Sequence, residues 1–182
     1  MPYPAKTSAE QILAAAVALL ERDGLAGLSL RALAAELKLT VNALYRYYPS
    51  RDALLAAMAT QAAGWLLAEL EAHMDFAALA QAYLRFAQGR PALYELYMTC
   101  DGLSAEQQAV YAQLWRLVVA RLEPLAGARS PEAAVTFWAY LHGLVGLERS
   151  GVYEGSEEKP RDSASYGLGL LLAGLQATAP PA

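Results

Sequence analysis

Apolar residues along the chain recur at intervals of three and four, and hardly any stretch alternates apolar and polar positions. Spacing of this kind is typical of helices that bury one face. We therefore predict an all-α protein. The expected helices cover about residues 8–22, 29–37, 40–47, 50–73, 75–88, 90–100, 104–126, 130–151 and 162–177.

Residues that begin and end helices stand at the right places in the first third of the chain. Ser8 and Gln11 form a capping-box pattern, in which each side chain bonds to the other residue's backbone amide. Gly24 can adopt the left-handed conformation that ends a helix. Ser29 and Thr40 each precede a short apolar-periodic segment, and their hydroxyls can accept amides of its first turn. These residues predict three short helices in succession.

Two of these segments are joined by Lys38 and Leu39 alone, which is too short to be anything but a turn. Pro49 ends the second segment because it biases Tyr48 toward extended geometry. Two short helices joined by a tight turn form the helix-turn-helix arrangement, whose second helix enters the major groove of DNA. The pattern therefore predicts sequence-specific DNA binding.

The expected fourth helix, about residues 50–73, is long enough to leave one domain and join another. We predict a three-helix helix-turn-helix domain over residues 1–55 and a larger helical domain over residues 56–182. Residues 1–55 hold six basic and five acidic residues, whereas the rest carries a charge of −5 within a total of −4. Only the first domain is suited to phosphate, and a dimer would double its basic surface.

Composition sets wider limits on the class of protein. The 182 residues are 56% hydrophobic and 18% charged, which is ample for a buried core. One cysteine, Cys100, excludes a disulfide within the chain. The first residues lack an apolar signal core, and the tract 168–175, taken as the most apolar, is far shorter than the roughly 20 residues that span a bilayer. We expect a soluble, cytoplasmic protein with no membrane segment.

Residues 8–58 resemble the DNA-binding domain of the tetracycline-repressor (TetR) family of bacterial transcription regulators. Lys38 departs from the family pattern, which usually has glycine in the turn, and Tyr48 replaces the usual phenylalanine. The resemblance implies a homodimer in which a small molecule, bound in each subunit, changes the spacing of two DNA-reading heads. The matching residues are 12–16, Gly24, 28–34, 39–40, 44–51 and 54–55.

The second half carries a weaker resemblance to one branch of the same family. Residues 89–97 and 137–144 look like the ligand domain of a branch marked by a tryptophan, a histidine and a glycine on the penultimate long helix. Here these residues are Trp138, His142 and Gly143.

The predicted DNA contacts gather around the second helix of the helix-turn-helix. Arginine and asparagine pair with guanine and adenine edges respectively, and a helix N-terminus favours phosphate. The alternative is that these side chains are solvated surface, or core in the case of the tyrosines, of which Tyr48 is the expected core residue. The predicted DNA-binding residues are Ser29, Arg31, Lys38, Thr40, Val41, Asn42, Ala43, Tyr45, Arg46, Tyr47 and Arg51.

Aromatic residues are concentrated in the second domain. Ligand sites are mostly apolar with a few convergent polar groups, so we predict a site for a small apolar or aromatic effector. Ordinary core packing is the alternative for each residue. The predicted ligand-binding residues are Tyr94, Tyr97, Met98, Tyr111, Trp115, Trp138 and His142.

The last two long helices carry glycine at close intervals, although glycine costs about 1 kcal/mol relative to alanine inside a helix. Close approach of another helix explains this. A partner subunit's helix is one source of that approach, and packing within one subunit is the other. The residues are Gly143, Gly146, Gly167, Gly169 and Gly174.

The leading hypothesis is a ligand-responsive DNA-binding regulator, a repressor that binds a palindromic operator as a homodimer. One alternative is a helical small-molecule-binding protein that has lost DNA binding. Another is a small all-α enzyme using His142 or Cys100, but neither residue has partners at a meaningful spacing. His73 is the only other histidine, so we expect no metal site, no cofactor and no catalytic residues.

Overall fold

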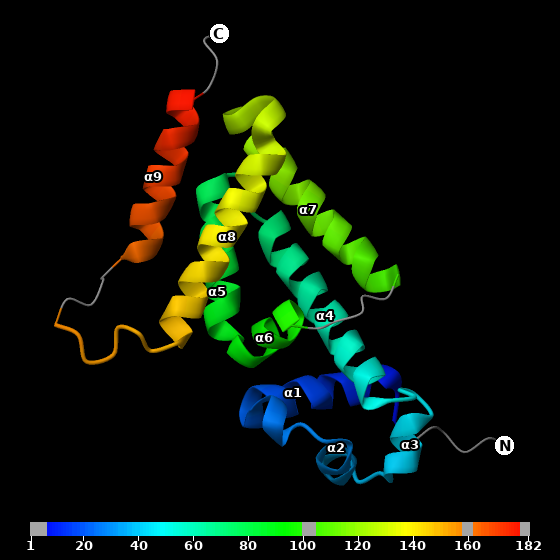
Figure 1. Cartoon of the computed structure of the whole chain (residues 1–182). Coiled ribbons are helices and arrows are strands. Elements are labelled where there is room, and N and C mark those ends of the chain that lie inside the picture. Colours follow the sequence, from blue (N-terminus) through cyan, green and yellow to red (C-terminus); the bar gives the residue numbers. More distant parts are fainter. Residues whose placement is uncertain (1–6, 100–104, 158–161, 179–182) are drawn as a thin grey trace. The chain divides into compact units, whose positions relative to one another are not determined.

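The computed structural model describes residues 7–99, 105–157 and 162–178, and all regular secondary structure in these ranges is helical (Figure 1). The all-α prediction is confirmed. The helices are α1 (Ala9–Gly27), α2 (Leu30–Glu36), α3 (Val41–Tyr45), α4 (Arg51–Glu71), α5 (Phe76–Gly89), α6 (Pro91–Thr99), α7 (Ala105–Ala126), the short 3₁₀ helix η1 (Gly127–Arg129), α8 (Ser130–Arg149) and α9 (Ser163–Thr178).

Side-chain caps explain where several helices begin. The Ser8 hydroxyl accepts the Gln11 amide at 3.2 Å, and the Gln11 side chain accepts the Ser8 amide at 3.1 Å, which is the predicted capping box. Asp75 caps α5 and Asp162 caps α9, because each carboxylate accepts an amide of the first turn at 2.9 and 3.1 Å. Such acceptors satisfy amides that have no partner within the helix.

Gly24 interrupts α1, as its predicted role as a helix stop requires. Its φ of 68° is in the left-handed region, where a side chain is disfavoured. Helical residues resume after it and continue to Gly27, so α1 is longer than predicted and has a break near its end. The Leu28 amide then bonds to the Gly24 carbonyl at 3.2 Å and closes this short segment.

The chain forms two compact units. The first unit comprises the chain up to Trp65 together with Gly89–Tyr111, and the second comprises Leu66–Gln88 and Ala112–Ala182. Helix α6 therefore belongs to the same unit as α1, α2 and α3. The division of function near residue 55 stays a prediction.

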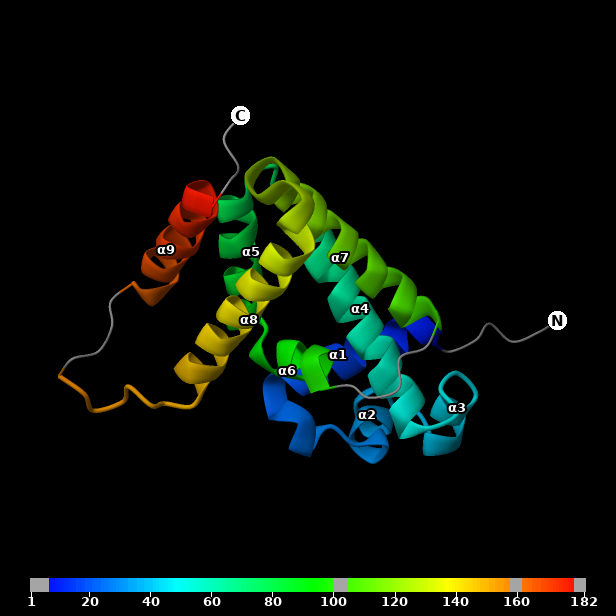
Figure 2. The same cartoon turned by 45° about the horizontal axis from the view of Figure 1, so that its top comes forward.

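In the first unit, α1 lies between α2 and α6 and packs on both, and α2 packs on α3 (Figures 1 and 2). Helix α1 buries Ile12, Leu19 and Leu20, and α2 and α3 bury Leu33 and Leu44. Each of these side chains is at most 1% exposed, so short helices with weak intrinsic stability are held by a shared core.

In the second unit, the Phe76 and Phe137 rings meet edge to face with centroids 4.5 Å apart. Helix α9 packs on α8. Gly167 permits this approach, because a Cβ atom there would overlap the Tyr140 ring. The Tyr140 hydroxyl donates to the Ser163 carbonyl at the start of α9. For Gly167, the close packing predicted from glycine is therefore packing within one chain.

Among the described residues, one helix is long and apolar enough by length and composition to cross a membrane, and it is α4 (Arg51–Glu71) rather than the tract 168–175. The core helix of a soluble protein meets the same criteria, so one such helix is weak evidence for a membrane span. Leu54, Met58, Leu66 and Leu70 of α4 are buried within the protein, which is what a core helix requires.

Candidate nucleic-acid interface

Helices α2 and α3 are both capped by the residues that the sequence predicted. The Ser29 hydroxyl accepts the Ala32 amide at 3.1 Å, and the Thr40 hydroxyl accepts the Ala43 amide at 3.3 Å. Helix α3 is shorter than the predicted 40–47, because the chain after Tyr45 continues as a turn. The two helices and their connection form a helix-turn-helix.

The turn between the two helices contains Lys38 at a φ of 53°. The Leu39 amide bonds to the Ala34 carbonyl at 2.8 Å, which fixes this turn. A residue with a side chain in this left-handed conformation costs roughly 1–2 kcal/mol relative to the right-handed form, so Lys38 holds the turn under strain. The Lys38 side chain is exposed.

Most of α3 is accessible. Leu44, which is 1% exposed, anchors the helix to the core. Asn42 and Arg46 are both exposed, and residues four apart lie on the same face of a helix. Thr40 is exposed at the start of the helix, and Val41 and Ala43 are half-buried. Arg46 is the C-cap residue and keeps right-handed helical backbone angles, so the exposed amide and guanidinium lie on the same side of α3.

The three tyrosines around α3 have different environments. Tyr45 is exposed. The Tyr47 hydroxyl donates to the Thr7 carbonyl at 2.8 Å, so donation to a phosphate would require that bond to be exchanged. The Tyr48 hydroxyl donates to the Ala9 carbonyl at 3.1 Å, and burial raises the pKa of this hydroxyl. Tyr48 is half-buried, and its hydroxyl is satisfied within the chain.

The remaining predicted phosphate contacts are on the surface. Ser29, Arg31 and Arg51 are exposed. One terminal nitrogen of Arg51 donates a long bond of 3.5 Å to the Leu28 carbonyl. A guanidinium has five N–H donors, so this contact leaves donors of Arg51 for a phosphate.

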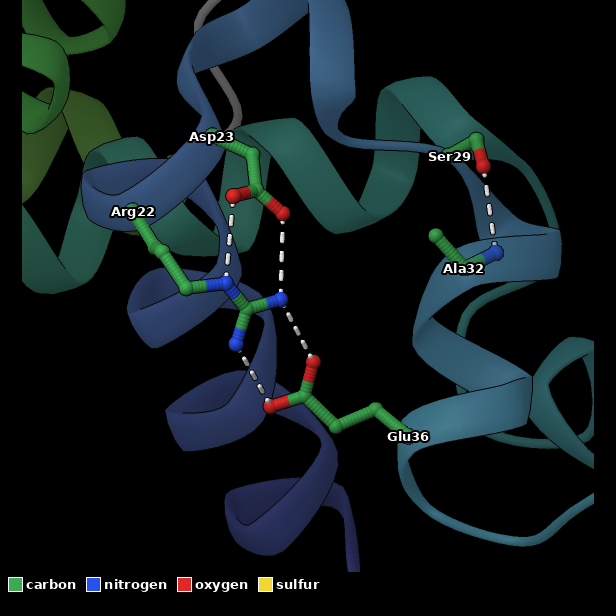
Figure 3. A network of polar contacts seen from close by, with 5 residues as sticks. All are labelled: Arg22, Asp23, Ser29, Ala32 and Glu36. Atoms are coloured by element: carbon green, nitrogen blue, oxygen red, sulfur yellow. Dashed lines mark hydrogen bonds and ion pairs between the residues drawn. The ribbon is translucent and has the colours of Figure 1, made fainter.

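Sequence reasoning missed Arg22, which ties the end of α1 to the end of α2 (Figure 3). Its guanidinium lies 3.0 Å from a carboxylate oxygen of Asp23 and 3.0 Å from one of Glu36. Hydrogen bonds to Asp23 and then to Glu36 raise the pKa of Arg22 above its already high value. The contact with Glu36 spans 14 residues, so helical spacing alone gives no signal for it.

Part of the predicted ligand set forms an aromatic cluster in the first unit. Tyr94 and Tyr97 of α6 are buried, with ring centroids 6.4 Å apart. Tyr111 of α7 stacks on Tyr97 at 5.2 Å. Met98 is half-buried beside them on α6. These four residues are the part of the prediction that the structure brings together.

The other predicted ligand residues lie in the second unit and are accessible. Trp115 is 40% exposed and Trp138 is 44% exposed. His142 is also exposed, one turn after Trp138 on α8.

A pocket of about 640 Å³ lies in the second unit between the end of α7, η1, the first turns of α8, and α9. None of the seven predicted ligand residues lines it. Its position depends on the packing of helices distant in sequence, which apolar spacing does not give. Its apolar walls include Leu125, Ala133, Phe137, Leu170, Leu171 and Leu175.

Within the described ranges, no three histidine, cysteine, aspartate or glutamate side chains are grouped so that they could hold a metal ion. Cys100, considered above as a reactive thiol, lies outside the described residues.

Two family models match the chain. That of the bacterial regulatory proteins of the tetR family covers residues 12–58, which include the whole helix-turn-helix. That of the tetracyclin repressor-like C-terminal domain covers residues 76–171, which is more than half of the chain. The chain belongs to the TetR family. It is a transcription regulator with a DNA-binding helix-turn-helix, and the families that it matches are regulators rather than enzymes.

Relatives of this TetR-family chain agree with the assignment. An HTH-type transcriptional regulator of Mycobacterium tuberculosis is 32% identical over an alignment of 162 residues, and the match covers 83% of this chain and 74% of that protein. A protein of unknown function from Rhodococcus sp. RHA1 is 28% identical with a TM-score of 0.79, over 97% of this chain and 99% of that one. BioQ, solved with its double-stranded DNA operator, is 27% identical with a TM-score of 0.65, over 94% and 99%.

Proposed function

We propose that this TetR-family regulator is a ligand-responsive repressor that binds a palindromic operator as a homodimer. The observation that carries the proposal is the surface of α3, where Asn42 and Arg46 are exposed on one face while Leu44 anchors the helix. An α-helix fits the major groove, where side chains of these two types read adenine and guanine.

The surrounding residues supply phosphate contacts in this proposal. Lys38 and Arg51 are exposed cations at the two ends of the reading region. Ser29 and Arg31 begin α2, and Tyr45 follows the reading face of α3. Phosphate contacts fix the position of a protein on DNA, whereas base contacts select the sequence. The solved complex of BioQ with its operator supports a DNA target for this chain.

The homodimer is supported by an apolar stripe on α8. Val135, Trp138, His142 and Gly146 are exposed and recur at intervals of three and four residues, so they lie on one face of α8. Leu170 on α9 is also exposed. Contiguous exposed apolar residues mark interaction surfaces, and two-fold symmetric dimers are the commonest homo-oligomers. We infer that α8 and α9 pair with their copies in a second subunit.

The effector in this proposal is a small apolar or aromatic molecule. The aromatic cluster of Tyr94, Tyr97 and Tyr111, with Met98 beside it, supports an apolar site in the first unit. Trp138 and His142 carry the resemblance to the branch with tryptophan, histidine and glycine in its ligand domain. The functional division is a DNA-binding domain over residues 1–55 and a ligand-binding and dimerisation domain over residues 56–182.

A DNA target supports a cytoplasmic location for this regulator, and the proposal includes no membrane partner. The pocket beside η1, lined by residues such as Phe137 and Leu171, is a second possible position for the effector. Mass spectrometry of the ligand that copurifies with the protein identifies the effector. Hydrogen exchange then shows whether the bound effector protects the aromatic cluster of the first unit or the pocket of the second.

A gel-shift assay against the DNA upstream of the protein's own gene, in low salt, tests the central proposal. We expect the parent protein to shift this DNA and the double variant N42A/R46A to lose the specific complex. The alternative is a helical small-molecule-binding protein that has lost DNA binding, which is suggested by the charge of only +1 over residues 1–55. That protein would bind ligand and shift no DNA.

A further inference from the structure

Helix α6 is bonded to α1 through a side chain that caps it. The Glu21 carboxylate, near the end of α1, accepts the backbone amide of Leu93 at 3.2 Å. Leu93 lies in the first turn of α6 (Pro91–Thr99) and is fully buried. The two residues are 72 positions apart in sequence but belong to the same compact unit.

This cap comes from outside α6 because the helix has none of its own. The residue before Pro91 is Arg90, whose side chain has no hydrogen-bond acceptor. A carboxylate at a helix N-terminus accepts an unpaired amide and also interacts favourably with the helix dipole. Glu21 thus performs for α6 the role that Ser29 performs within its own segment for α2.

The start of α6 is held a second time within the first unit. The Arg90 guanidinium lies over the Trp65 ring of α4, 4.5 Å from its centroid. Helix α6 therefore has polar or cation–π ties to both α1 and α4, next to its buried residues Leu93 and Leu96.

The residue after Glu21 faces the helix-turn-helix. Arg22 bridges to Glu36, the last residue of α2 (Figure 3). Glu21 and Arg22 are consecutive, so the end of α1 bonds to the first turn of α6 with one side chain and to the end of α2 with the next. Three side chains, those of Glu21, Arg22 and Glu36, and one backbone unit thus connect the first turn of α6 to the end of α2.

We infer that Glu21 is a positioning residue for DNA recognition, because it makes α6 move as one body with the helix-turn-helix. The effect on DNA recognition rests on the proposed function. The joint movement of α6 with the helix-turn-helix concerns the first unit alone. The N-terminal family model ends at residue 58 and the C-terminal model begins at residue 76, so the family models include α6 in the C-terminal domain. Packing instead assigns α6 to the unit of α1 and α2.

The test uses the full-length protein and the variants Glu21→Ala, Glu21→Gln and Glu106→Ala. Glu106 is exposed in the first turn of α7. Its replacement therefore removes the same charge from the first unit but leaves the Glu21–Leu93 hydrogen bond in place. Hydrogen exchange is measured by mass spectrometry for peptides of α6 and for peptides of α2 and α3. Dissociation constants are measured for the operator and for an unrelated duplex of equal length.

We expect Glu21→Ala to raise exchange in the first turn of α6 and also in α2 and α3, and to weaken specific operator binding about 10-fold. Binding to the unrelated duplex is expected to stay unchanged. Glu21→Gln keeps an uncharged acceptor and is expected to lie between the parent and Glu21→Ala. Glu106→Ala is expected to match the parent.

Two results would overturn the inference. Exchange that rises in α6 while α2, α3 and operator affinity stay at parent values means that Glu21 only caps α6. Unchanged exchange in α6 means that the cap has no effect. If the parent protein binds no DNA, the proposed function fails, yet exchange in α2 and α3 of Glu21→Ala still decides whether the helices move together.

Discussion

The rings of Tyr97 and Tyr111 lie parallel, with centroids 5.2 Å apart and planes inclined by 7°. The Tyr111 hydroxyl donates to the Tyr97 carbonyl at 3.0 Å, so the stack is also fixed by a hydrogen bond between α7 and α6. Burial, followed by the neighbouring Tyr111 and Tyr94 hydroxyls, raises the pKa of Tyr97 well above its ordinary value of 10.0. The folded protein thus holds the neutral form of this tyrosine.

The raised pKa of Tyr97 predicts a loss of stability in alkali. Below pH 10.0 both states keep the proton, whereas above it the unfolded chain ionises first and the free energy of unfolding falls. Tyr97→Phe is expected to lessen this fall. Urea unfolding at about pH 8 and about pH 11 measures it. Equal losses in parent and variant would show that Tyr97 does not hold its proton on folding.

Asn42→Ala and Arg46→Ala are expected each to weaken operator binding by about 1–3 kcal/mol, because each removes a base contact. Their exposure predicts unfolding free energies within about 0.5 kcal/mol of the parent. Fluorescence anisotropy with labelled operator and with unrelated DNA separates specific from general binding. Arg129→Ala, an exposed arginine of η1, serves as the control for loss of charge. Operator affinity at the parent value in both variants would contradict the assignment of α3.

Lys38→Gly separates strain from phosphate binding at one position. Glycine at a φ of 53° relieves the left-handed conformation and is expected to raise the free energy of unfolding by up to about 1 kcal/mol. Loss of one cation is expected to weaken binding to all DNA and to reduce the salt slope by about 1. Thermal unfolding and salt titrations measure the two effects. An unchanged salt slope would remove Lys38 from the phosphate contacts.

Trp138→Arg is expected to convert the dimer to a monomer, because it puts a charge in the middle of the apolar stripe of α8. Trp115→Arg is the matched control, since that tryptophan is similarly exposed on α7 and lies outside the stripe. Sedimentation velocity at micromolar concentration measures the oligomeric state. A parent protein that sediments as a monomer would refute the dimer itself.

Gly167→Ala is expected to destabilise the protein by about 1–3 kcal/mol, because the added methyl group overlaps the Tyr140 ring. Gly64→Ala is the control, since a Cβ there meets nothing within 4 Å and alanine favours the helix. Urea unfolding compares the two variants. Stability equal to the parent in Gly167→Ala would mean that α9 does not pack closely on α8.

Helix ends and the turn between α2 and α3 could be predicted because their causes are local. A cap at Ser8, Ser29 or Thr40 joins atoms three residues apart, and the sequence states both partners. Lys38 stands where the TetR family usually has glycine, which indicates a position that favours positive φ, and Lys38 adopts that conformation. Apolar spacing also predicted the helices of the second half, and the resemblance to the TetR family added the expectation of a ligand-binding and dimerisation domain.

Contacts between distant helices could not be predicted. Glu21 and Leu93 meet only because α1 packs on α6, and no periodicity contains that information. Apolar spacing likewise does not distinguish a face that meets the chain's own core from one that remains exposed. Trp138 and His142, which we expect to bind the effector, are both exposed on α8, and their role stays a prediction.

Helix α3 has to be anchored to the core and also to keep other side chains exposed, and Leu44 provides the anchor. Because this one side chain secures the helix to the core, its neighbours Asn42 and Arg46 make no contribution to the core that a mutation would remove. Exchanges at those two positions thus carry almost no folding cost. If α3 reads the operator as proposed, exchanges at these two positions alter DNA specificity with little effect on folding, which makes α3 a practical place to engineer it.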